Sequence, residues 1–498
     1  MFTDISTSLA EIAHNAFKRW SLFSEKRKQK VVEMMLHAWT GYKNYSWGAN
    51  ELRPISMTSN TQAIFGGPKM PATIVDAADT LWIMGLRNEY EEARDYIKND
   101  FNMSLATGSA SVFETTIRFV GGLLSLYALT GEIFYIDKAR NVAEALLPAF
   151  TTPTGIPKSI VHMETKSASN YPWADGGSSI LSEIGSLHLE FTYLSHITGA
   201  AIFRKKVKKI RNVLYRAEKS DGLYSNYINP NTGMFSERRQ VKPNEIFIRL
   251  CFSLFDFRSL GALGDSFYEY LIKSWIQSDK TDEQARKMYW DASDAIKLHL
   301  IKKSKNGLTY VAELHDGVTN DKMGHLACFS VGMFALQAVN ENQIEKRKAT
   351  MELAEELGRT CHESYVRTPT HIGPEMFYFI GDEEARSKYG ENSYFLRPEV
   401  IEGYFYLWRL TGNSKYRDWT WDAIVSIDKY CRVKGGFSGL NDVNDLRSGH
   451  DDVQQSFFLA ETLKYAYLTF SENSVIPLDQ WVFNTEAHPL PVMNLSEV

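Results

Sequence analysis

The chain has 498 residues, of which 44% are hydrophobic and 13% aromatic, so it contains ample apolar material for a large core. Its formal net charge of −5 excludes a general polyanion binder, and we expect no nucleic-acid partner. Nowhere does a continuous run of about 18 apolar residues predict a membrane span. The four cysteines are too few for a disulfide framework and form no CxxC pair.

The predicted elements are mainly helices. The N-terminal stretch MFTDISTSLAEIAHNAFKRW is typical of an amphipathic helix, so we assign residues 1–30 to a lead-in helix. Apolar residues then recur at three- and four-residue spacing in stretches separated by short loops with Gly or Pro. These stretches are VVEMMLHAWTGYKNYSW, TTIRFVGGLLSLYAL, LHLEFTYLSHITG, RKATMELAEELGRTCHESY and VIEGYFYLWRLTG.

A short repeat follows three of the predicted helices. LTGEIFY, ITGAAIF and LTGNSKY share Thr-Gly, three variable residues and an aromatic, with the threonines at Thr130, Thr198 and Thr411. The glycine suits a left-handed helix end, and the aromatic suits the start of the next helix. The spacing fits a unit of roughly 70 residues that recurs about seven times. It predicts one closed α/α barrel of helical hairpins, unless the three helix ends are alike by chance.

One segment differs from its surroundings. QVKPNEIFIRLCFSLFDFRSL is apolar, aromatic and strand-like, and we interpret residues 240–258 as an insertion. The segment lies just before Asp265 and is apolar enough to need burial or a partner.

Carboxylates recur inside apolar helices, where an isolated charge is costly unless it is paired or functional. Glu114 and Arg118 lie four residues apart, so they share a helix face and can form an ion pair. Further candidates in apolar surroundings are Glu183, Asp265 and Glu375.

The most informative stretch is SYFLRPEVIEGYFYLWRL. A proline suits the first turn of a helix, which places Glu399 and Glu402 on one face of that helix. Arg397 precedes them and could orient the carboxylates or balance their charge. Phe457 and Glu461 repeat the arrangement at a spacing of four residues.

Convergent carboxylates serve two chemistries. A carboxylic acid and a carboxylate together cleave glycosidic bonds, and crowded oxygen atoms bind a hard cation such as Ca²⁺. The histidines show no zinc spacing, and the chain has no HExxH, GxSxG, P-loop or dinucleotide fingerprint.

Taken together, these motifs resemble the class I α-1,2-mannosidases, glycoside hydrolase family 47, from about Trp39 to Pro489. The resemblance is carried by NYSWGANELRPIS, ATIVDAADTLWIMG, VFETTIRFVGGLLS, GDSFYEYLIKSW, KMGHLACF, LRPEVIEGYFYLWR, FFLAETLKYAYLTF and WVFNTEAHP. It implies an all-α-dominated fold, a single (α/α)7 barrel over residues 31–492. A few short strands, an extended C-terminal segment that plugs the barrel, and a tail at 493–498 complete it.

The resemblance also implies an inverting exo-glycosidase that removes terminal α-1,2-linked mannose from high-mannose N-glycans on glycoproteins. Glu399 would be the general base. Glu114 is the leading candidate for the acid, acting through a water, and Asp265 is the rival for that role. Inversion requires a carboxyl separation near ~6.5–9.5 Å. The residues implied to line the sugar pocket are Arg118, Glu183, His325, Glu375, Arg397, Glu402, Phe457 and Glu461.

The family cofactor is Ca²⁺, and Thr485 would bind it through its carbonyl and hydroxyl oxygens. Several carboxylates would hold waters on the ion. Cys328 and Cys361 match the family disulfide. Leu263 matches the Golgi enzymes, where the related ER enzyme has arginine, so we expect trimming of several mannoses with little branch choice.

We expect a location in the Golgi lumen, with the ER lumen as the second choice. Golgi members carry a cytoplasmic tail, a membrane anchor and a stem, which we expect this chain to lack except for a stem remnant in residues 1–30. No obligate protein partner is indicated. The alternative function is that of a glycan-binding ER quality-control protein of the same fold, with weak or no activity.

Overall fold

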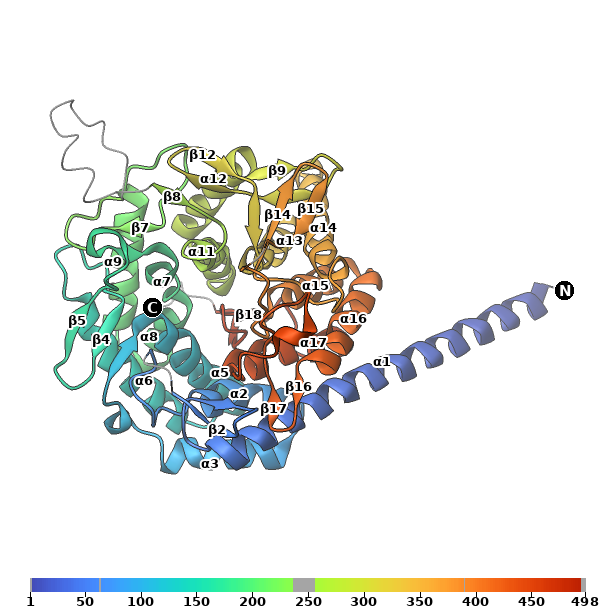
Figure 1. Cartoon of the computed structure of the whole chain (residues 1–498), viewed down its shortest axis with the longest axis horizontal. Coiled ribbons are helices and arrows are strands. Elements are labelled where there is room, and N and C mark those ends of the chain that lie inside the picture. The colour runs from blue at the N-terminus through green and yellow to red at the C-terminus, as the bar shows by residue number, and fades with distance from the viewer. Residues whose placement is uncertain (1, 62–63, 236–255, 389, 494–498) are drawn as a thin grey trace.

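The computed structural model describes residues 2–61, 64–235, 256–388 and 390–493. The chain passes once around a closed ring, and its C-terminal part returns to the centre (Figure 1). Within the described residues, two concentric layers of seven helices form this ring. The predicted (α/α)7 barrel is therefore confirmed.

The inner layer consists of helices that are buried over most of their surface. Each contacts the next, and the π-helical turn before the last helix packs on the first, which closes the ring. These helices are α2 (Ala72–Ile83), α5 (Gly121–Thr130), α8 (His188–Thr198), α11 (Asp265–Gln277), α13 (Ser330–Val339), α15 (Glu399–Thr411) and α17 (Leu463–Phe470). Short turns extend several of them at the N-terminal side: α4 (Val112–Glu114), η2 (Thr115–Val120), α7 (Leu181–Gly185), η6 (Leu326–Phe329) and η8 (Phe458–Thr462).

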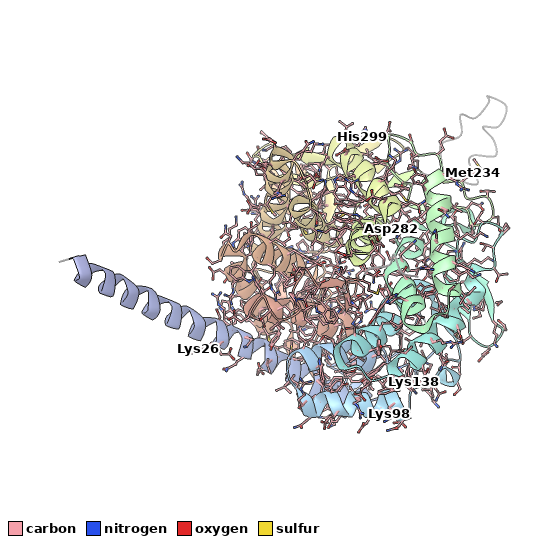
Figure 2. The ribbon with its side chains drawn as sticks, turned by 180° about the vertical axis from the view of Figure 1, so that it is seen from behind. Lys26, Lys98, Lys138, Met234, Asp282 and His299 are labelled. Carbon is pink, nitrogen blue, oxygen red and sulfur yellow. A yellow bond between two sulfur atoms is a disulfide. The ribbon has the colours of Figure 1, made fainter. Side chains whose placement is uncertain are left out.

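The outer layer covers the inner one, and each outer helix packs on the inner helix beside it. Seen from behind, Lys98 on α3 and Lys138 on α6 lie at the periphery of the barrel (Figure 2). The outer helices are α1 (Phe2–Ser46), α3 (Arg87–Asn99), α6 (Phe134–Leu146), α9 (Ile202–Arg216), α12 (Glu283–His299), α14 (Ile344–Val366) and α16 (Lys415–Tyr430).

Helix α1 extends well beyond the ring at its N-terminal end (Figure 1). Its C-terminal part packs on α17, and its buried side chains include Val31, Met34 and Trp39. The predicted boundary between the lead-in helix and the barrel at residue 30 falls inside this single helix.

The Thr-Gly repeat marks three of the turns from an inner to an outer helix. The glycine after each threonine adopts positive φ, at 75°, 66° and 69°, as the left-handed cap requires. Each threonine hydroxyl also donates to the carbonyl four residues earlier and accepts from the backbone N–H two residues later. The aromatics of the repeat are fully buried at the start of the next helix. The sequence pattern therefore identified real, equivalent turns.

The short strands lie almost entirely in the connections from an outer helix to the next inner helix. They form antiparallel sheets of two or three strands. Their bounds are β1 (Glu51–Arg53), β2 (Thr58–Asn60), β3 (Ser109–Ser111), β4 (Ile160–His162), β5 (Ser167–Ser169), β6 (Ser179–Ile180), β7 (Tyr227–Ile228), β8 (Phe257–Arg258), β9 (Ile301–Lys303), β10 (Thr309–Val311), β11 (Glu313–His315), β12 (Val318–Asn320), β13 (Lys322–Gly324), β14 (Met376–Ile380), β15 (Glu383–Arg386), β16 (Arg432–Val433) and β17 (Gly436–Phe437). These loops therefore gather where the inner helices begin. Helix N-termini carry partial positive charge, which favours carboxylates at this end of the barrel.

The C-terminal segment enters the centre of the ring as a hairpin. Strand β18 (Trp481–Phe483) pairs antiparallel with β19 (Pro489–Pro491) and contacts α11, while β19 contacts α5. Phe483 is fully buried between Phe405 and Tyr465, with ring centroids 5.7 and 5.6 Å away. The predicted plug is present, and its form is a tight hairpin whose turn, residues 484–488, reaches the middle of the barrel.

Three further predictions concern particular segments. Most of the proposed insertion at 240–258, up to residue 255, lies outside the described residues. Its last part contains β8 (Phe257–Arg258), which pairs with β11. Cys328 and Cys361 form the predicted disulfide. The stretch Val112–Thr130 is long and apolar enough to cross a membrane, but 72% of it is buried inside the barrel.

Candidate active site

A cavity of about 520 Å³ opens where the inner helices begin. Its wall contains nine of the twelve residues that were predicted to act in catalysis, sugar binding or metal binding. They are Glu114, Arg118, Glu183, Asp265, Arg397, Glu399, Phe457, Glu461 and Thr485. The other three, His325, Glu375 and Glu402, do not line the cavity; they lie behind its wall and contact residues that do.

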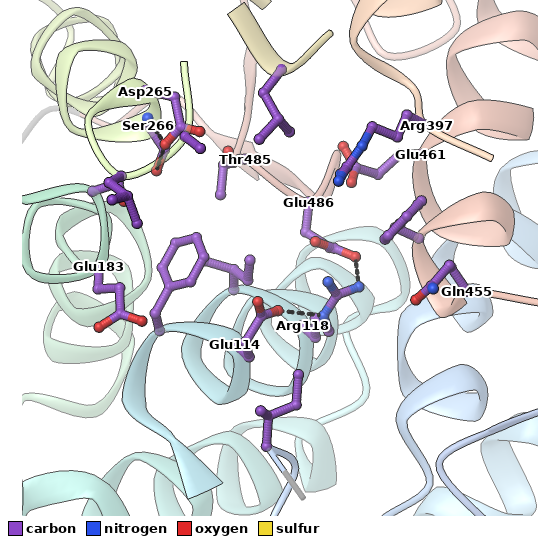
Figure 3. A pocket seen from close by; sticks show the side chains of 18 of the residues that line it. Glu114, Arg118, Glu183, Asp265, Ser266, Arg397, Gln455, Glu461, Thr485 and Glu486 are labelled. Carbon is purple, nitrogen blue, oxygen red and sulfur yellow. Dashed lines mark hydrogen bonds and ion pairs between the residues drawn. The ribbon is translucent and has the colours of Figure 1, made fainter. Parts of the chain in front are cut away.

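One side of the cavity is a row of charged side chains. Arg118 donates from Nε to Glu114 at 2.9 Å, and its Nη1 pairs with Glu486 (Figure 3). The same Nη1 lies 3.1 Å from Asp76. The predicted Glu114–Arg118 pair is thus confirmed. Arg118 lies in the π-helical turn η2, and Glu461 lies in the second π-helical turn, η8. Such turns are frequent at functional sites, because the extra residue redirects the side chains of an inner helix.

Glu399, the first residue of α15, is held as a charged carboxylate. His325 Nδ1 lies 2.7 Å from its Oε2, and Arg397 immediately precedes the helix. Burial alone would raise the pKa of Glu399, but the hydrogen bond with His325 and the positive charge of Arg397 bring it below its usual value. Arg397 is itself oriented by Glu375, whose Oε1 accepts from Nε at 2.6 Å.

Two other carboxyl groups in the cavity wall have raised pKa values, unlike Glu399. Burial raises the pKa of Asp265 to about 7, and the nearby charge of Glu399 contributes. Burial likewise raises the pKa of Glu183 to about 8, and Glu114 adds to the shift. The cavity therefore combines a charged carboxylate with carboxyl groups that hold protons near neutral pH.

Glu461 and Glu402 lie deeper in the barrel. Burial, followed by the charges of Glu399 and Glu402, raises the pKa of Glu461 well above its usual value. Glu402 has its Oε1 4.0 Å from Lys273 Nζ and accepts from Tyr465 at 3.4 Å. It therefore supports the cavity wall from behind.

The hairpin turn is fastened by Asn484, which is fully buried. Its Nδ2 donates to the carbonyl of Ile117 at 2.9 Å and to Glu190 at 2.8 Å, while its Oδ1 accepts from the backbone N–H groups of Glu486 and His488. A Cβ atom at Gly121 would lie 2.5 Å from Asn484 Nδ2. Glycine at this point of α5 therefore allows the turn to approach the helix.

A second set of charges fixes the far side of the turn. The ring of His488 bridges two buried carboxylates, with Nδ1 2.8 Å from Asp79 and Nε2 3.1 Å from Asp76. Lys464 lies 2.9 Å from Asp79 and donates to the carbonyl of Ala487 at 2.7 Å. Although burial opposes it, the two aspartates raise the pKa of His488. Between them, these contacts hold Thr485 at the tip of the turn, facing the cavity (Figure 3).

Comparison with known proteins identifies the family to which this site belongs. Residues 34–492 match the profile described as glycosyl hydrolase family 47. The chain belongs to this family. A Caenorhabditis elegans protein named mannosyl-oligosaccharide 1,2-alpha-mannosidase mans-2 is 64% identical over 94% of this chain and 77% of its own length. The human mannosyl-oligosaccharide 1,2-alpha-mannosidase IB is 52% identical over 95% and 70% respectively.

A solved structure agrees in fold with this family 47 chain. The α-1,2-mannosidase from Trichoderma reesei superposes with a TM-score of 0.82 at 27% sequence identity. The match covers 94% of this chain and 99% of that one. The resemblance inferred from the sequence motifs is therefore confirmed.

The family 47 cavity suits a hard cation. Its wall contains seven acidic residues and two arginines. The acidic residues are Glu51, Glu114, Glu183, Asp265, Glu399, Glu461 and Glu486, and the arginines are Arg118 and Arg397. Within the described chain, neither the carbonyl nor the hydroxyl oxygen of Thr485 accepts a hydrogen bond from the protein. No three His, Cys, Asp or Glu side chains of the described chain converge as a direct metal site. Thr485 thus offers two free oxygens in a wall rich in carboxyl oxygens, and such oxygen ligands fit the implied Ca²⁺.

The mouth of the cavity presents apolar surface. The rings of Tyr171 and Trp173 stack with centroids 5.1 Å apart, and Trp173 is 59% exposed. Phe457 also lines the wall, with the guanidinium of Arg118 5.6 Å from its ring centroid. Leu263 also lines the cavity; its φ is 76°, and its carbonyl accepts a hydrogen bond from the Ser182 N–H. Such aromatic and apolar surfaces suit the faces of sugar rings.

Sequence reasoning missed several residues of the site. Glu51 and Glu486 line the cavity, although both lie inside the motifs NYSWGANELRPIS and WVFNTEAHP that carried the resemblance. Asp76, Asp79 and Lys464 lie on inner helices without lining the cavity, and their partners in the turn are distant in sequence. All five residues lie in the matching motifs, so the charges inside the apolar stretches of those motifs were the signal that could have found them.

Proposed function

We propose that the chain is a Ca²⁺-dependent exo-α-1,2-mannosidase that trims high-mannose N-glycans during glycoprotein maturation, with inversion at the sugar. The relatives named above support the substrate linkage. The observation that carries the proposal is a single cavity that combines a charged Glu399 with a protonated Asp265, next to a threonine with two free oxygens. A charged base and a proton-bearing acid are what glycoside hydrolysis requires.

Glu399 is our proposed general base. His325 and Arg397 keep its carboxylate charged, so it can accept a proton from a water that attacks the sugar. Glu399→Gln keeps the shape of the side chain and should lower kcat by about 10²–10⁴-fold. Retention of activity by this variant would refute the assignment.

The proton donor has two candidates. Burial raises the pKa of Asp265 to about 7, so this group can carry a proton, whereas Glu114 accepts a hydrogen bond from Arg118 Nε. We therefore propose that Asp265 donates and that Glu114 orients a water or a sugar hydroxyl. Asp265→Asn should lose activity on natural glycans while retaining it on an aryl mannoside whose leaving group needs no proton. If Glu114→Gln shows this pattern and Asp265→Asn does not, the roles are reversed.

Thr485 is our proposed protein ligand to Ca²⁺. A bound ion would take oxygen ligands from Thr485 and from sugar hydroxyls. Thr485→Ala should abolish both the calcium-induced rise in melting temperature and the calorimetric binding signal, while the helical circular dichroism is unchanged. Calcium binding equal to that of the wild type would refute the ligand assignment.

The decisive test of function is digestion of a high-mannose glycan with and without a chelator. We expect free mannose only when calcium is present, released first as the β-anomer, which NMR detects. Release that is insensitive to chelation would refute calcium dependence, and α-mannose would refute inversion. Absence of mannose in both conditions, with glycan binding retained, would favour the glycan-binding alternative.

We further propose that the protein works in the Golgi lumen, with the ER lumen as the alternative. The Cys328–Cys361 disulfide supports an oxidising compartment, because such bonds are rare in the cytosol. Immunofluorescence of the native protein against Golgi and ER markers tests the location. A diffuse cytosolic signal would refute both compartments.

A further inference from the structure

A buried chain of hydrogen bonds lies behind Glu399. His325 Nδ1 is 2.7 Å from Glu399 Oε2, and His325 Nε2 is 2.7 Å from the hydroxyl of Tyr365. His325 is fully buried and Tyr365 is 2% exposed, whereas Glu399 faces the cavity. The chain therefore runs from the outer layer of the barrel to the proposed base.

The histidine and the tyrosine of this hydrogen-bonded chain are both rigidly placed. His325 directly precedes η6, and its backbone N–H donates to the carbonyl of Glu375 at 2.9 Å. Tyr365 lies near the C-terminal end of α14. Its ring packs closely on the backbone of Gly373, where an added Cβ atom would lie 2.4 Å from the ring. The disulfide joins Cys328, three residues after the histidine, to Cys361, four residues before the tyrosine. The His325–Tyr365 contact is thus held by a covalent link between η6 and α14.

The geometry favours one protonation state of the imidazole. The Tyr365 hydroxyl stays protonated, because burial raises its pKa well above the usual value, so it can donate to Nε2. A ring whose Nε2 accepts must carry its proton on Nδ1, which then donates to Glu399. The alternative is a doubly protonated ring in a fully buried position. Arg397 already supplies a cation to Glu399, so a second buried charge would add desolvation cost.

We propose that Tyr365 is a positioning residue for the general base: its hydroxyl donates to Nε2 of His325 and fixes the Nδ1–H tautomer that orients Glu399. The inference rests on the proposed role of Glu399 as the base. Without the hydroxyl, the ring can place its proton on Nε2 and turn a bare Nδ1 towards the carboxylate. Glu399 would then lose a donor and become harder to keep charged.

Other charged groups also act on Glu399. Arg397 precedes it, Glu402 follows on its own helix, and carboxyl groups from two other elements interact with it. Those carboxyl groups are Asp265 of α11 and Glu461 of η8. None of these charged groups changes in a Tyr365→Phe variant. Tyr394, which also interacts with Glu399, loses its hydrogen bond with the Tyr365 hydroxyl, so a shift in the pH profile reports the loss of that hydroxyl and its contacts.

The experiment compares Tyr365→Phe with Tyr416→Phe. Tyr416 is equally buried on an outer helix, but its hydroxyl is paired with Glu355 at 3.0 Å. We expect Tyr365→Phe to lower kcat by about 10–100-fold, the usual effect of losing an orienting partner. KM should stay within about twofold, and the acid limb of the kcat–pH profile should move up by roughly one pH unit. Tyr416→Phe should retain the wild-type kcat and pH profile.

A second measurement does not depend on a variant folding. In ¹⁵N–¹H spectra of histidine-labelled wild-type protein, the His325 signal, assigned with His325→Gln, should show a neutral ring protonated at Nδ1. A doubly protonated ring, or a proton on Nε2, would overturn the proposal. So would wild-type kcat and pH dependence in Tyr365→Phe. A wrong assignment of Glu399 as the base gives a different result. In that case Glu399→Gln would stay active, whichever tautomer His325 shows.

Discussion

Replacing Asn484 with aspartate exchanges one NH₂ group for an oxygen where the C-terminal hairpin is fastened to the barrel. The size of the side chain is unchanged, and the two hydrogen bonds accepted by Oδ1 remain possible. The two bonds donated by Nδ2 are lost. The new oxygen would face the carbonyl of Ile117 at 2.9 Å and a carboxylate oxygen of Glu190 at 2.8 Å.

The cost follows from these contacts. Two lost hydrogen bonds contribute about 1–1.5 kcal/mol each, and the buried oxygens left facing one another add ~1–3 kcal/mol. The free energy of unfolding should therefore fall by about 3–6 kcal/mol. Burial already raises the pKa of Glu190 to about 7, so this carboxyl can keep a proton and share it with the introduced aspartate at lower pH. The loss should be smallest near pH 5 and grow as pH rises through 7.

The assay is chemical denaturation of both proteins at pH 5 and pH 8, with calcium affinity measured by calorimetry at pH 8. Asn444→Asp is the control, since its Nδ2 donates to Ser387 in an exposed position. It should change stability by less than about 0.5 kcal/mol. Wild-type stability of Asn484→Asp at pH 8, or a loss that does not depend on pH, would refute the role of Asn484 in holding the turn.

Three further outcomes are expected. Leu263→Arg, at the cavity wall, should restrict trimming to one glycan branch; an unchanged order of mannose release would contradict this. Gly121→Ala places a methyl group 2.5 Å from Asn484 Nδ2 and should lower the free energy of unfolding by about 1–3 kcal/mol. In the control Gly108→Ala, the nearest atom to the new methyl group is 3.5 Å away, and the change should be tolerated. Equal denaturation curves for the two variants would refute the clash. Burial raises the pKa of Glu183 to about 8, above its value in the unfolded chain, so the folded state binds this proton more tightly. The calcium-free protein should therefore lose stability as pH rises from 5 to 9. A melting temperature that increases over this range would contradict the raised pKa of Glu183.

Local patterns were readable from the sequence because their physics is local. The Thr-Gly turns depend on one left-handed residue and on hydrogen bonds to residues two and four positions away. The Glu114–Arg118 pair depends on a four-residue spacing, which brought the two side chains together even though the backbone there is π-helical. Glu399 was found because a charge in an apolar helix needs a partner or a function.

The sequence did not predict how deep in the barrel each side chain lies. Glu399 and Glu402 are three residues apart, yet one faces the cavity and the other lies behind it against Lys273. His325 was expected to line the sugar pocket, but it lies behind the wall and is hydrogen-bonded to Glu399, the proposed base. Which side of the wall a carboxylate or imidazole occupies depends on the helices packed around it, not on its own spacing.

The sequence by itself determined the hairpin repeat, the family, the carboxylates of the site and the C-terminal plug. Only the tertiary structure decided how the plug is held and how the site is charged. His488 meets Asp76 from 412 positions away, and Asn484 meets Ile117 from 367. Such contacts exist only once the ring has closed around the hairpin, and the protonation of each carboxyl depends on the burial and charges that this closure creates.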